Sequence, residues 1–550
     1  MLRAEPLGEI PGETVRVARA AFPKGNLYLR MRDELGVLYE DADFATLFPP
    51  LGRPALPPWR LALITIFQFL EGLPDRQAAD AVRARLDWKY ALGLELTDSG
   101  FDFSVLTEFR SRLIEGNQEH LLLDKMLSQF KARDLLKLRG KQRTDSTHVI
   151  GAVRRLWRLD LIVETLRAAL NQIAHLDSEW LQPRLTAEWV KRYARRVEME
   201  RLPTSEQARK RYAVEVGQDG FDLLEMLDQD GTEDLRCLEA VGVLRLVWEQ
   251  QFAVDADSKA VRWKAKQEQP PSSERPGSPY DPDTRFAANR SKTWLGYRVH
   301  LSETCDQGSP ELITNVHLTG AAVGDVTTLP TIHEQLGAND FVPIQHLVDG
   351  GYLSAEILAA HQDGEIQLIG PAKRSSSWQQ RTPGAFTHDD FQIDWANKDV
   401  KCPQNFLNAS WVEKVSSDGM PTITVKFRKR TCARCPVRSR CTRADPAQSG
   451  RTLVLRHEEQ YRALNSARTQ QQQTDWFKKY ALRAGVEGTI SQAVRRFDLR
   501  HARYWGMAKM RLQALGTAAA LNLVRFDAWT QGVPRGATRI PILARIALIA

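Results

Sequence analysis

Apolar residues recur at helical spacing through the first part of the chain. The segment 57–73, PPWRLALITIFQFLEGL, predicts an apolar helix, and 75–94 predicts an amphipathic one. A third helix follows and presents Arg110 and Arg112. Residues 1–140 are therefore expected to form an all-helical domain. Short helices joined by tight turns fit a helix-turn-helix bundle that binds DNA, and a plain bundle used for dimerisation is the alternative.

The pattern changes to that of a strand at 141–153, which predicts the first strand of a core. β-Branched residues are frequent there, and Asp145 lies among them. An acid inside a core strand is costly to bury without a partner, which is either a metal ion or an Arg or hydrogen-bond network. Helical periodicity then returns over 154–265, so this block is expected to be a helical insertion.

Strand patterns resume after a linker at 266–290, which is rich in Pro and Ser. The pattern predicts paired strands at 294–305 and 311–320 and a helix at 324–337. It also predicts a strand that turns into a second helix within 341–361, and a last strand at 366–371. Asp349 lies where the strand within 341–361 ends. The alternation predicts a mixed α/β sheet, and acids at strand ends are where such sheets place their sites.

A second insertion is predicted at 372–455, with short strands and four cysteines. These are Cys402, Cys432, Cys435 and Cys441. Six cysteines in the whole chain do not make a disulfide scaffold, so a reducing cytosol is the expected setting. In that setting the four favour a tetrahedral Zn²⁺ site, although only one pair has the usual CxxC spacing. Four unlinked reduced thiols are the alternative.

The segment 476–513 is strongly basic. From Lys478 to Arg511 there are nine Lys or Arg residues and two acids, of which Glu487 is one. On a helix, Tyr480, Arg483 and Glu487 share one face, because they follow i, i+3, i+7 spacing. A carboxylate that holds a divalent cation beside an Arg that binds phosphate suits this place. The alternative is a solvated basic helix with one salt-bridged Glu.

Composition limits the class of protein without identifying it. The chain has 550 residues and a formal net charge of +8, which indicates two to four domains and is consistent with a nucleic-acid partner. The N-terminus has no apolar core segment, so no signal peptide is expected. No apolar run is long enough to span a bilayer, so no membrane partner is expected.

Three acids stand out from this pattern: Asp145, Asp349 and Glu487. Phosphodiester chemistry uses such a set, because two divalent ions activate a water or a 3′-hydroxyl and stabilise the leaving oxygen. Hard ions such as Mg²⁺ or Mn²⁺ prefer carboxylate oxygens. His148 and His346 lie close to the acids in sequence and are expected to give polar support, since hard cations favour oxygen over imidazole.

Three stretches in this order resemble the motifs of bacterial insertion-sequence transposases of the DDE class, which have an RNase H-like core. They are TDSTHVIGAV, HLVDGGYLSAE and YALRAGVEGTISQAVRRFDLRHARYWGMAKMRLQ. The third carries the signature Tyr-x2-Arg-x3-Glu at Tyr480, Arg483 and Glu487. The N-terminal part resembles the InsH-type transposase domain, and the helical and cysteine-containing insertions resemble those of one large subgroup. The similarity covers most of the chain.

The resemblance implies roles for individual residues. It implies that Asp145, Asp349 and Glu487 are catalytic and hold two Mg²⁺ or Mn²⁺ ions. It places Tyr480 and Arg483 near the DNA backbone at the cut site. The basic residues of the same segment are expected to hold DNA as well: Arg495, Arg496, Arg500 and Lys509. The chain departs from the signature at Val494, where a Lys or Arg is usual and where Arg495 follows instead.

The implied activity is binding of terminal inverted repeats, cleavage at the element ends, and attack of the freed 3′-hydroxyl on target DNA. Synapsis of two ends implies at least a homodimer on double-stranded DNA, in a cytoplasmic protein associated with the nucleoid. A domesticated, non-catalytic DNA-binding relative and a stand-alone RNase H-like nuclease are the rival functions. The expected organisation begins with a helical domain (1–140), the first strand (141–153), a helical insertion (154–265) and a linker (266–290). The core (291–371), the cysteine insertion (372–455), the C-terminal core helices (456–530) and a tail (531–550) follow.

Overall fold

The protein divides into two compact units. The computed structural model describes residues 1–2, 9–198, 202–229, 232–289, 292–362, 364–373, 377–416 and 419–534, so most of the predicted tail lies outside the described residues. Unit 1 comprises Met1–Lys137, Asp145–Val323 and Val486–Ala550, and unit 2 comprises Leu138–Thr144 and Gly324–Gly485. Helices and strands are mixed, as the sequence predicts. Among the described helices, none combines the length and apolarity needed to cross a membrane.

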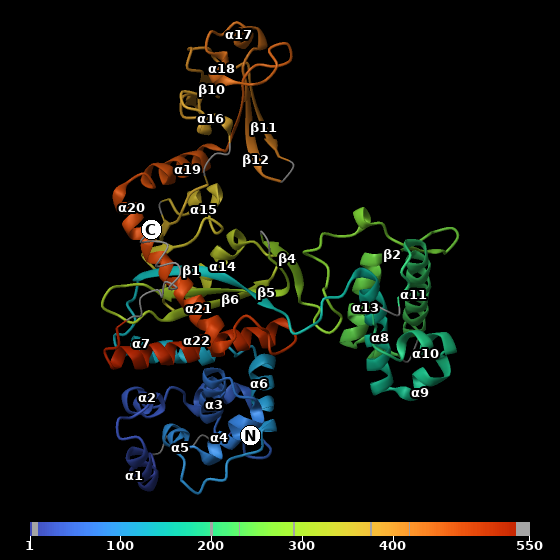
Figure 1. The fold of residues 1–550 in the computed structure, drawn as a ribbon, viewed down its shortest axis with the longest axis vertical. Helices are drawn as coiled ribbons and strands as arrows, with labels where there is room; N and C mark the ends of the chain where they lie inside the picture. The colour runs from blue at the N-terminus through green and yellow to red at the C-terminus, as the bar shows by residue number, and fades with distance from the viewer. Residues whose placement is uncertain are drawn as a thin grey trace, which may run out of the picture. The chain divides into compact units, whose positions relative to one another are not determined.

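Unit 1 begins with a group of helices. They are α1 (Gly12–Ala21), α2 (Leu27–Leu35), the 3-10 helix η1 (Asp41–Leu47), α3 (Pro58–Glu71), α4 (Asp75–Ala84), α5 (Leu86–Leu92), α6 (Ser104–Glu115) and α7 (Leu121–Lys131). The long helix α22 (Met507–Thr530) packs on α3 and α7 (Figure 1). Gly516 makes the close approach to α3 possible, because a Cβ there would lie 2.2 Å from the ring of Phe69.

One basic residue of this group differs from the sequence prediction. Arg110 is not presented to solvent but is 7% exposed. Its guanidinium donates two hydrogen bonds to the Asp75 carboxylate, at 2.9 and 2.6 Å. The helical period of α6 cannot reveal this burial, because the partner that compensates the charge lies on α4.

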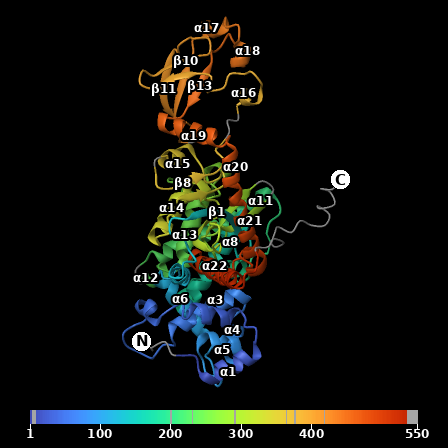
Figure 2. The ribbon, with the colours of Figure 1, turned by 90° about the vertical axis from the view of Figure 1, so that its left-hand side faces the viewer.

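The helical insertion, whose helices α8, α11 and α13 are labelled in Figures 1 and 2, has a hydrophobic core of its own. Its helices are α8 (Arg158–Leu176), α9 (Ser178–Leu181), η2 (Gln182–Arg184), α10 (Ala187–Tyr193), α11 (Glu206–Leu227), α12 (Glu233–Arg236) and α13 (Glu239–Gln251). Gly220 on α11 lets α13 approach, since a Cβ there would lie 2.2 Å from the indole of Trp248. The block ends in a two-stranded hairpin rather than a helix, formed by β2 (Phe252–Val254) and β3 (Val261–Trp263).

The mixed sheet has six strands. They are β1 (Lys141–Ile150), β4 (Arg285–Asn289), β5 (Lys292–Thr304), β6 (Ile313–Gly320), β7 (Gln345–Leu347) and β8 (Gln367–Ile369). The order is β4-β5-β1-β7-β8, with β6 also on β5. β4, β5 and β6 pair antiparallel, whereas β7 pairs in parallel with β1 and β8. The predicted linker therefore ends in a strand, β4, after a short 3-10 turn, η4 (Lys266–Glu268).

Unit 2 adds helices to its strands and carries the cysteines in a separate lobe. The helices are α14 (Asp325–Ala338), α15 (Ala355–Ala360), α19 (Glu458–Gln470), α20 (Thr474–Ala481) and η5 (Leu482–Ala484). The lobe consists of α16 (Trp378–Arg381), β9 (Gln392–Asp394), β10 (Asp399–Lys401), β11 (Ser410–Val415), β12 (Pro421–Lys426), α17 (Lys429–Ala433), α18 (Arg438–Cys441) and β13 (Thr452–Leu455). Strands β11, β12 and β13 form one antiparallel sheet around a small apolar core. Helix α19 then packs on α15.

A buried carboxylate ties three elements of unit 1 together. Glu303 on β5 is 0% exposed. It accepts hydrogen bonds from Thr489 on α21 (Gly485–Phe497) at 2.5 Å and from Arg525 on α22 at 2.6 Å. A charge in this position is stable only with its partners, because water cannot replace them. The contact therefore fixes α21 and α22 on the sheet.

Replacing Arg525 by Met is expected to lower the free energy of opening of α22 by about 3 kcal/mol, because the Glu303 carboxylate would stay buried without its cation. Amide hydrogen exchange along α22 measures this. Lys509→Met on the same helix is the matched control, since Lys509 is exposed and its loss should cost less than about 0.5 kcal/mol. Equal effects of the two variants would contradict the role of the ion pair.

Candidate active site

The first predicted acid lies in the middle of β1. Asp145 is half-buried and its Oδ1 accepts a hydrogen bond from the Ser146 amide at 2.8 Å. The neighbours Thr144 and Thr147 are buried. The strand thus fixes the backbone at Asp145 while part of the carboxylate remains accessible.

The second predicted acid, Asp349, follows the end of β7 in unit 2. It is half-buried, and its Oδ1 accepts from the Gly351 amide at 2.7 Å. A Cβ on Gly351 would lie 2.9 Å from that oxygen and 3.1 Å from Oδ2 of Asp325, at the start of α14. A glycine is therefore needed where two carboxylates approach the turn, and Asp325 is an acid that the sequence pattern did not single out.

The third predicted acid lies on α21 in unit 1, and its surroundings differ from the prediction in one respect. Tyr480, Arg483 and Glu487 are not on one continuous α-helix: they lie on α20, on η5 and in the first turn of α21. The 3-10 turn winds more tightly than an α-helix, so α-helical spacing does not carry across it. Glu487 is exposed, whereas Val486 and Thr489 beside it are buried.

Contacts with β1 hold the chain on both sides of Glu487. In unit 2, the Arg143 guanidinium donates to the carbonyl of Leu482 at 2.6 Å, and Arg143 is 3% exposed. In unit 1, the Ile150 amide donates to the Arg500 carbonyl at 2.7 Å, and the Ala502 amide donates to the Ile150 carbonyl at 2.9 Å. The strand that carries Asp145 therefore also positions the segments before and after α21.

Positive side chains gather around the second half of β1 in unit 1. Burial lowers the pKa of His148, and the cations Arg500, Lys292 and Arg298 lower it further. The Arg500 guanidinium is also 3.4 Å from the Thr147 hydroxyl, to which it donates. Lys292 and Arg298 come from β5 and were not among the sequence candidates. The only signal in the sequence that could have pointed to them was their position in or next to a segment predicted as a strand.

The remaining DNA-binding candidates occupy two kinds of position. Arg495, Arg496 and Lys509 are exposed, so their charges face solvent. Tyr480 is half-buried, and its ring stacks on Trp476 with centroids 4.8 Å apart. Arg500 is half-buried, and its contact with Thr147 braces β1.

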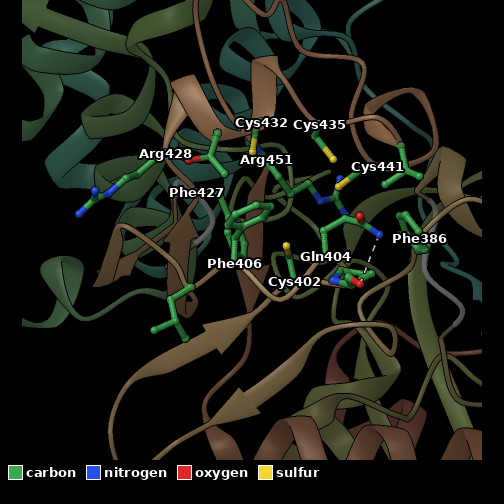
Figure 3. A pocket seen from close by; sticks show the side chains of 14 residues that line it. Phe386, Cys402, Gln404, Phe406, Phe427, Arg428, Cys432, Cys435, Cys441 and Arg451 are labelled. Atoms are coloured by element: carbon green, nitrogen blue, oxygen red, sulfur yellow. Dashed lines mark hydrogen bonds between the residues drawn. The ribbon is translucent and has the colours of Figure 1, made fainter.

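The four predicted cysteines line one cavity in the lobe of unit 2, together with Arg451 and Phe386 (Figure 3). They are free thiols of intermediate burial: Cys402, Cys432, Cys435 and Cys441. The Arg451 amide donates to the Cys432 sulfur at 3.4 Å. The structure therefore brings together four residues that span the chain from β10 to α18.

The thiols are close enough to influence one another electrostatically. Burial raises the pKa of Cys441 to about 11; the Arg451 cation opposes this shift, and Cys432, Cys435 and Cys402 add to it. Cys441 is thus a neutral thiol near pH 7 in this arrangement. Within the described part of the chain, no three His, Cys, Asp or Glu side chains are already grouped as a metal site. The donor set itself, four thiols around one cavity, fits a soft or borderline cation such as Zn²⁺.

Two family models match the chain. Residues 401–526 match the model described as "Transposase DDE domain", and residues 16–112 match the model described as "Transposase domain (DUF772)". The first match contains Glu487 and the four cysteines of the lobe. The second covers most of the N-terminal helices of unit 1. No curated protein and no solved structure matches the chain.

Two glycines of α21 test the anchoring by Arg143. Gly485→Ala is expected to destabilise α21 by about 2 kcal/mol, because the new Cβ would lie 2.1 Å from Nη1 of Arg143. Gly488→Ala is the matched control: nothing lies within 4 Å of its Cβ position, so it should stabilise the helix by up to about 1 kcal/mol. Amide hydrogen exchange of α21 measures both. Stabilisation by both variants would show that Arg143 does not constrain this helix.

Proposed function

We propose that this chain, an insertion-sequence transposase of the DDE class by its two family matches, binds terminal inverted repeats and catalyses metal-dependent cleavage and strand transfer of DNA. The matched transposase families indicate a DNA substrate and an enzyme of transposition. In this function, cleavage takes place at the element ends, and the freed 3′-hydroxyl then attacks target DNA.

The strand pairing of β1 and β7 is the observation that carries the proposal. Lys141 pairs with Gln345 and Arg143 with Leu347, in parallel. Asp145 lies two residues after Arg143, and Asp349 lies two residues after Leu347, so both acids are equally far beyond the last pair. Two carboxylates at equivalent positions beyond the last pair of parallel residues suit the joint binding of hard cations. We therefore assign Asp145 and Asp349 as catalytic acids, with Glu487 as the third.

The proposed layout is an RNase H-like core. The mixed sheet, with antiparallel β4, β5 and β6 and parallel β1, β7 and β8, supports this assignment. In the proposal, 1–140 binds DNA or forms a dimer, 141–153 and 291–371 form the core, and 456–530 supplies the third acid. The segments 154–265 and 372–455 are insertions joined through the linker 266–290, and 531–550 is a tail.

The three carboxylates would hold two Mg²⁺ or Mn²⁺ ions, which supply activation of a water or 3′-hydroxyl and charge stabilisation when bound. The donor set fits, because all three acids are oxygen donors and each is exposed or half-buried. In both aspartates, Oδ1 accepts a hydrogen bond from a backbone amide, and this bond orients the carboxylate.

The basic residues then bind the phosphate backbone. Exposed guanidinium and ammonium groups neutralise phosphates without reading sequence. Arg495, Arg496 and Lys509 are exposed and suit this role, and Arg500 adds charge beside β1. Tyr480 and Arg483 are assigned to the backbone at the cut site. Because two ends must be held together, we expect a homodimer on double-stranded DNA, in a protein that associates with the nucleoid.

A cleavage and strand-transfer assay on labelled element ends separates this function from its rivals. Joining of ends to target DNA supports a transposase, cutting without joining indicates a nuclease, and binding without cutting indicates a non-catalytic relative. The assay needs the genomic flanks of the element, which supply the end sequences.

Asp145→Asn, Asp349→Asn and Glu487→Gln are each expected to reduce cleavage by more than about a hundredfold, because loss of a ligand should exceed the cost of losing a supporting group. DNA affinity should not fall, since each variant removes one negative charge from a site near phosphate. Binding and cleavage are measured on the same DNA. Glu459→Gln on α19 is the control for charge removal, since Glu459 is exposed. Wild-type turnover in any of the three would remove that residue from the set.

We also propose that the four thiols of the lobe bind one structural Zn²⁺. Purified protein is expected to contain one equivalent of zinc, and Cys435→Ser to lose it, because a tetrahedral site needs all four ligands. Cys237→Ser is the matched control, since Cys237 is an exposed cysteine of the helical insertion. Elemental analysis measures the metal. Metal-free wild-type protein with four titratable thiols would refute the site.

A further inference from the structure

Three histidines of unit 2 form a continuous chain of hydrogen bonds that ends next to Asp145. The Thr144 hydroxyl is 2.6 Å from Nε2 of His346. Nδ1 of His346 is 2.8 Å from Nε2 of His333, and Nδ1 of His333 is 3.2 Å from Nε2 of His361. Nδ1 of His361 is 2.8 Å from the carbonyl oxygen of Ile357. The chain thus links β1, β7, α14 and the end of α15.

When the three rings are neutral, the carbonyl at one end fixes the direction of every bond in the chain. A carbonyl only accepts, so Nδ1 of His361 must carry hydrogen and donate to Ile357. In the neutral ring, Nε2 of His361 then accepts from Nδ1 of His333. The same logic makes Nδ1 of His346 the donor to His333, and the Thr144 hydroxyl the donor to His346. All three neutral histidines are therefore Nδ1–H tautomers.

Burial favours the neutral rings that this arrangement requires. His346 is 0% exposed, and burial holds its pKa well below the usual value, with His333 and His361 lowering it further. Burial lowers the pKa of His333 to about 4, and His361 adds to the shift. Neutral histidines can each donate once and accept once, which a chain with a single direction needs. The three rings therefore use both nitrogens.

We propose that His361, His333 and His346 form a positioning relay, which fixes the Thr144 hydroxyl and keeps β1 in register with β7 where the two catalytic aspartates follow. His346 lies on β7 opposite Gln142, yet its side chain bonds to Thr144. This diagonal bond opposes sliding of one strand along the other, because a shift of one residue would place every side chain on the opposite face. The relay acts through the aspartates, so its effect on catalysis rests on the proposed function.

The relay predicts a specific pattern in two variants of its central residue. His333→Phe fills the space but can neither accept from His346 nor donate to His361. His333→Gln restores both bonds, because one amide offers an acceptor and a donor. In His333→Phe, the Mg²⁺ concentration for half-maximal cleavage of end DNA should rise about fivefold, the effect of one net hydrogen bond. The rate at saturating Mg²⁺ should stay near that of the wild type, and His333→Gln should restore the Mg²⁺ dependence.

Two readouts on the full chain do not depend on activity. Nitrogen-15 NMR of histidine-labelled protein above neutral pH should show Nδ1–H tautomers for all three rings. Amide hydrogen exchange should be faster at Gln142, Arg143 and Leu347 in His333→Phe and unchanged in His333→Gln. If His333→Phe does not fold, His361→Phe at the less buried end of the relay replaces it in both experiments.

The outcomes separate the relay from the proposed function. Nε2–H tautomers or mixed tautomers in the wild type would overturn the relay whatever the enzyme does. Faster exchange with a fallen maximal rate and an unchanged Mg²⁺ dependence would reduce the histidines to ordinary core residues and overturn the positioning role. Correct tautomers and exchange in a protein that never cleaves DNA would support the relay as a structural device, and the proposed function would fail instead.

Discussion

The guanidinium of Arg143 is the contact on which the geometry around the third acid depends. It is buried on β1 and donates to the carbonyl of Leu482, at the turn that leads into α21. Gly485 leaves the space that the guanidinium occupies, since any larger residue would bring a Cβ within 2.1 Å of it. An Arg without such a partner would be too costly to bury. The strand that carries the first acid thus also determines where the helix with the third acid begins.

Around all three acids, the groups that position the chain are more buried than the acids themselves. Groups that position the chain are buried, such as Glu303 and His346, whereas Asp145 and Asp349 are half-buried and Glu487 is exposed. A buried charge or polar group is confined by its partners and so defines a single geometry. A carboxylate with the proposed role of binding a cation beside a nucleic acid has to remain accessible. The fold places its strongest constraints one or two residues away from the acids and not on them.

The sequence predicted the elements whose signal is local. Apolar alternation located β5 and β6, and the acid after β7 followed from the strand pattern, because both depend on neighbouring residues only. The order of the three motifs also predicted a transposase of the DDE class, and two transposase family models match parts of the chain. Strand β4 was hidden in a segment that resembles a linker, because its pairing with β5 and not its composition makes it a strand.

Features that depend on distant partners could not be predicted from spacing. The pairing of Arg110 with Asp75 and that of Arg143 with Leu482 both join elements that periodicity treats separately. The 3-10 turn at η5 could not be predicted from spacing either. A shared face for Tyr480, Arg483 and Glu487 requires one continuous α-helix, and η5 interrupts it. A motif therefore singled out candidate residues, while the backbone between them had to be observed.

The two insertions differ in what holds them together, and this difference bears on the cysteines. The helical insertion buries a large set of apolar side chains, including Trp248 and Leu166, and so has a core sufficient for its size. The cysteine lobe has only a small core, formed by residues such as Val425 and Leu453. Small domains with limited cores need an additional constraint, and in a reducing compartment a metal ion supplies it where a disulfide would not persist. The four thiols gathered beside that core are the groups able to supply this constraint.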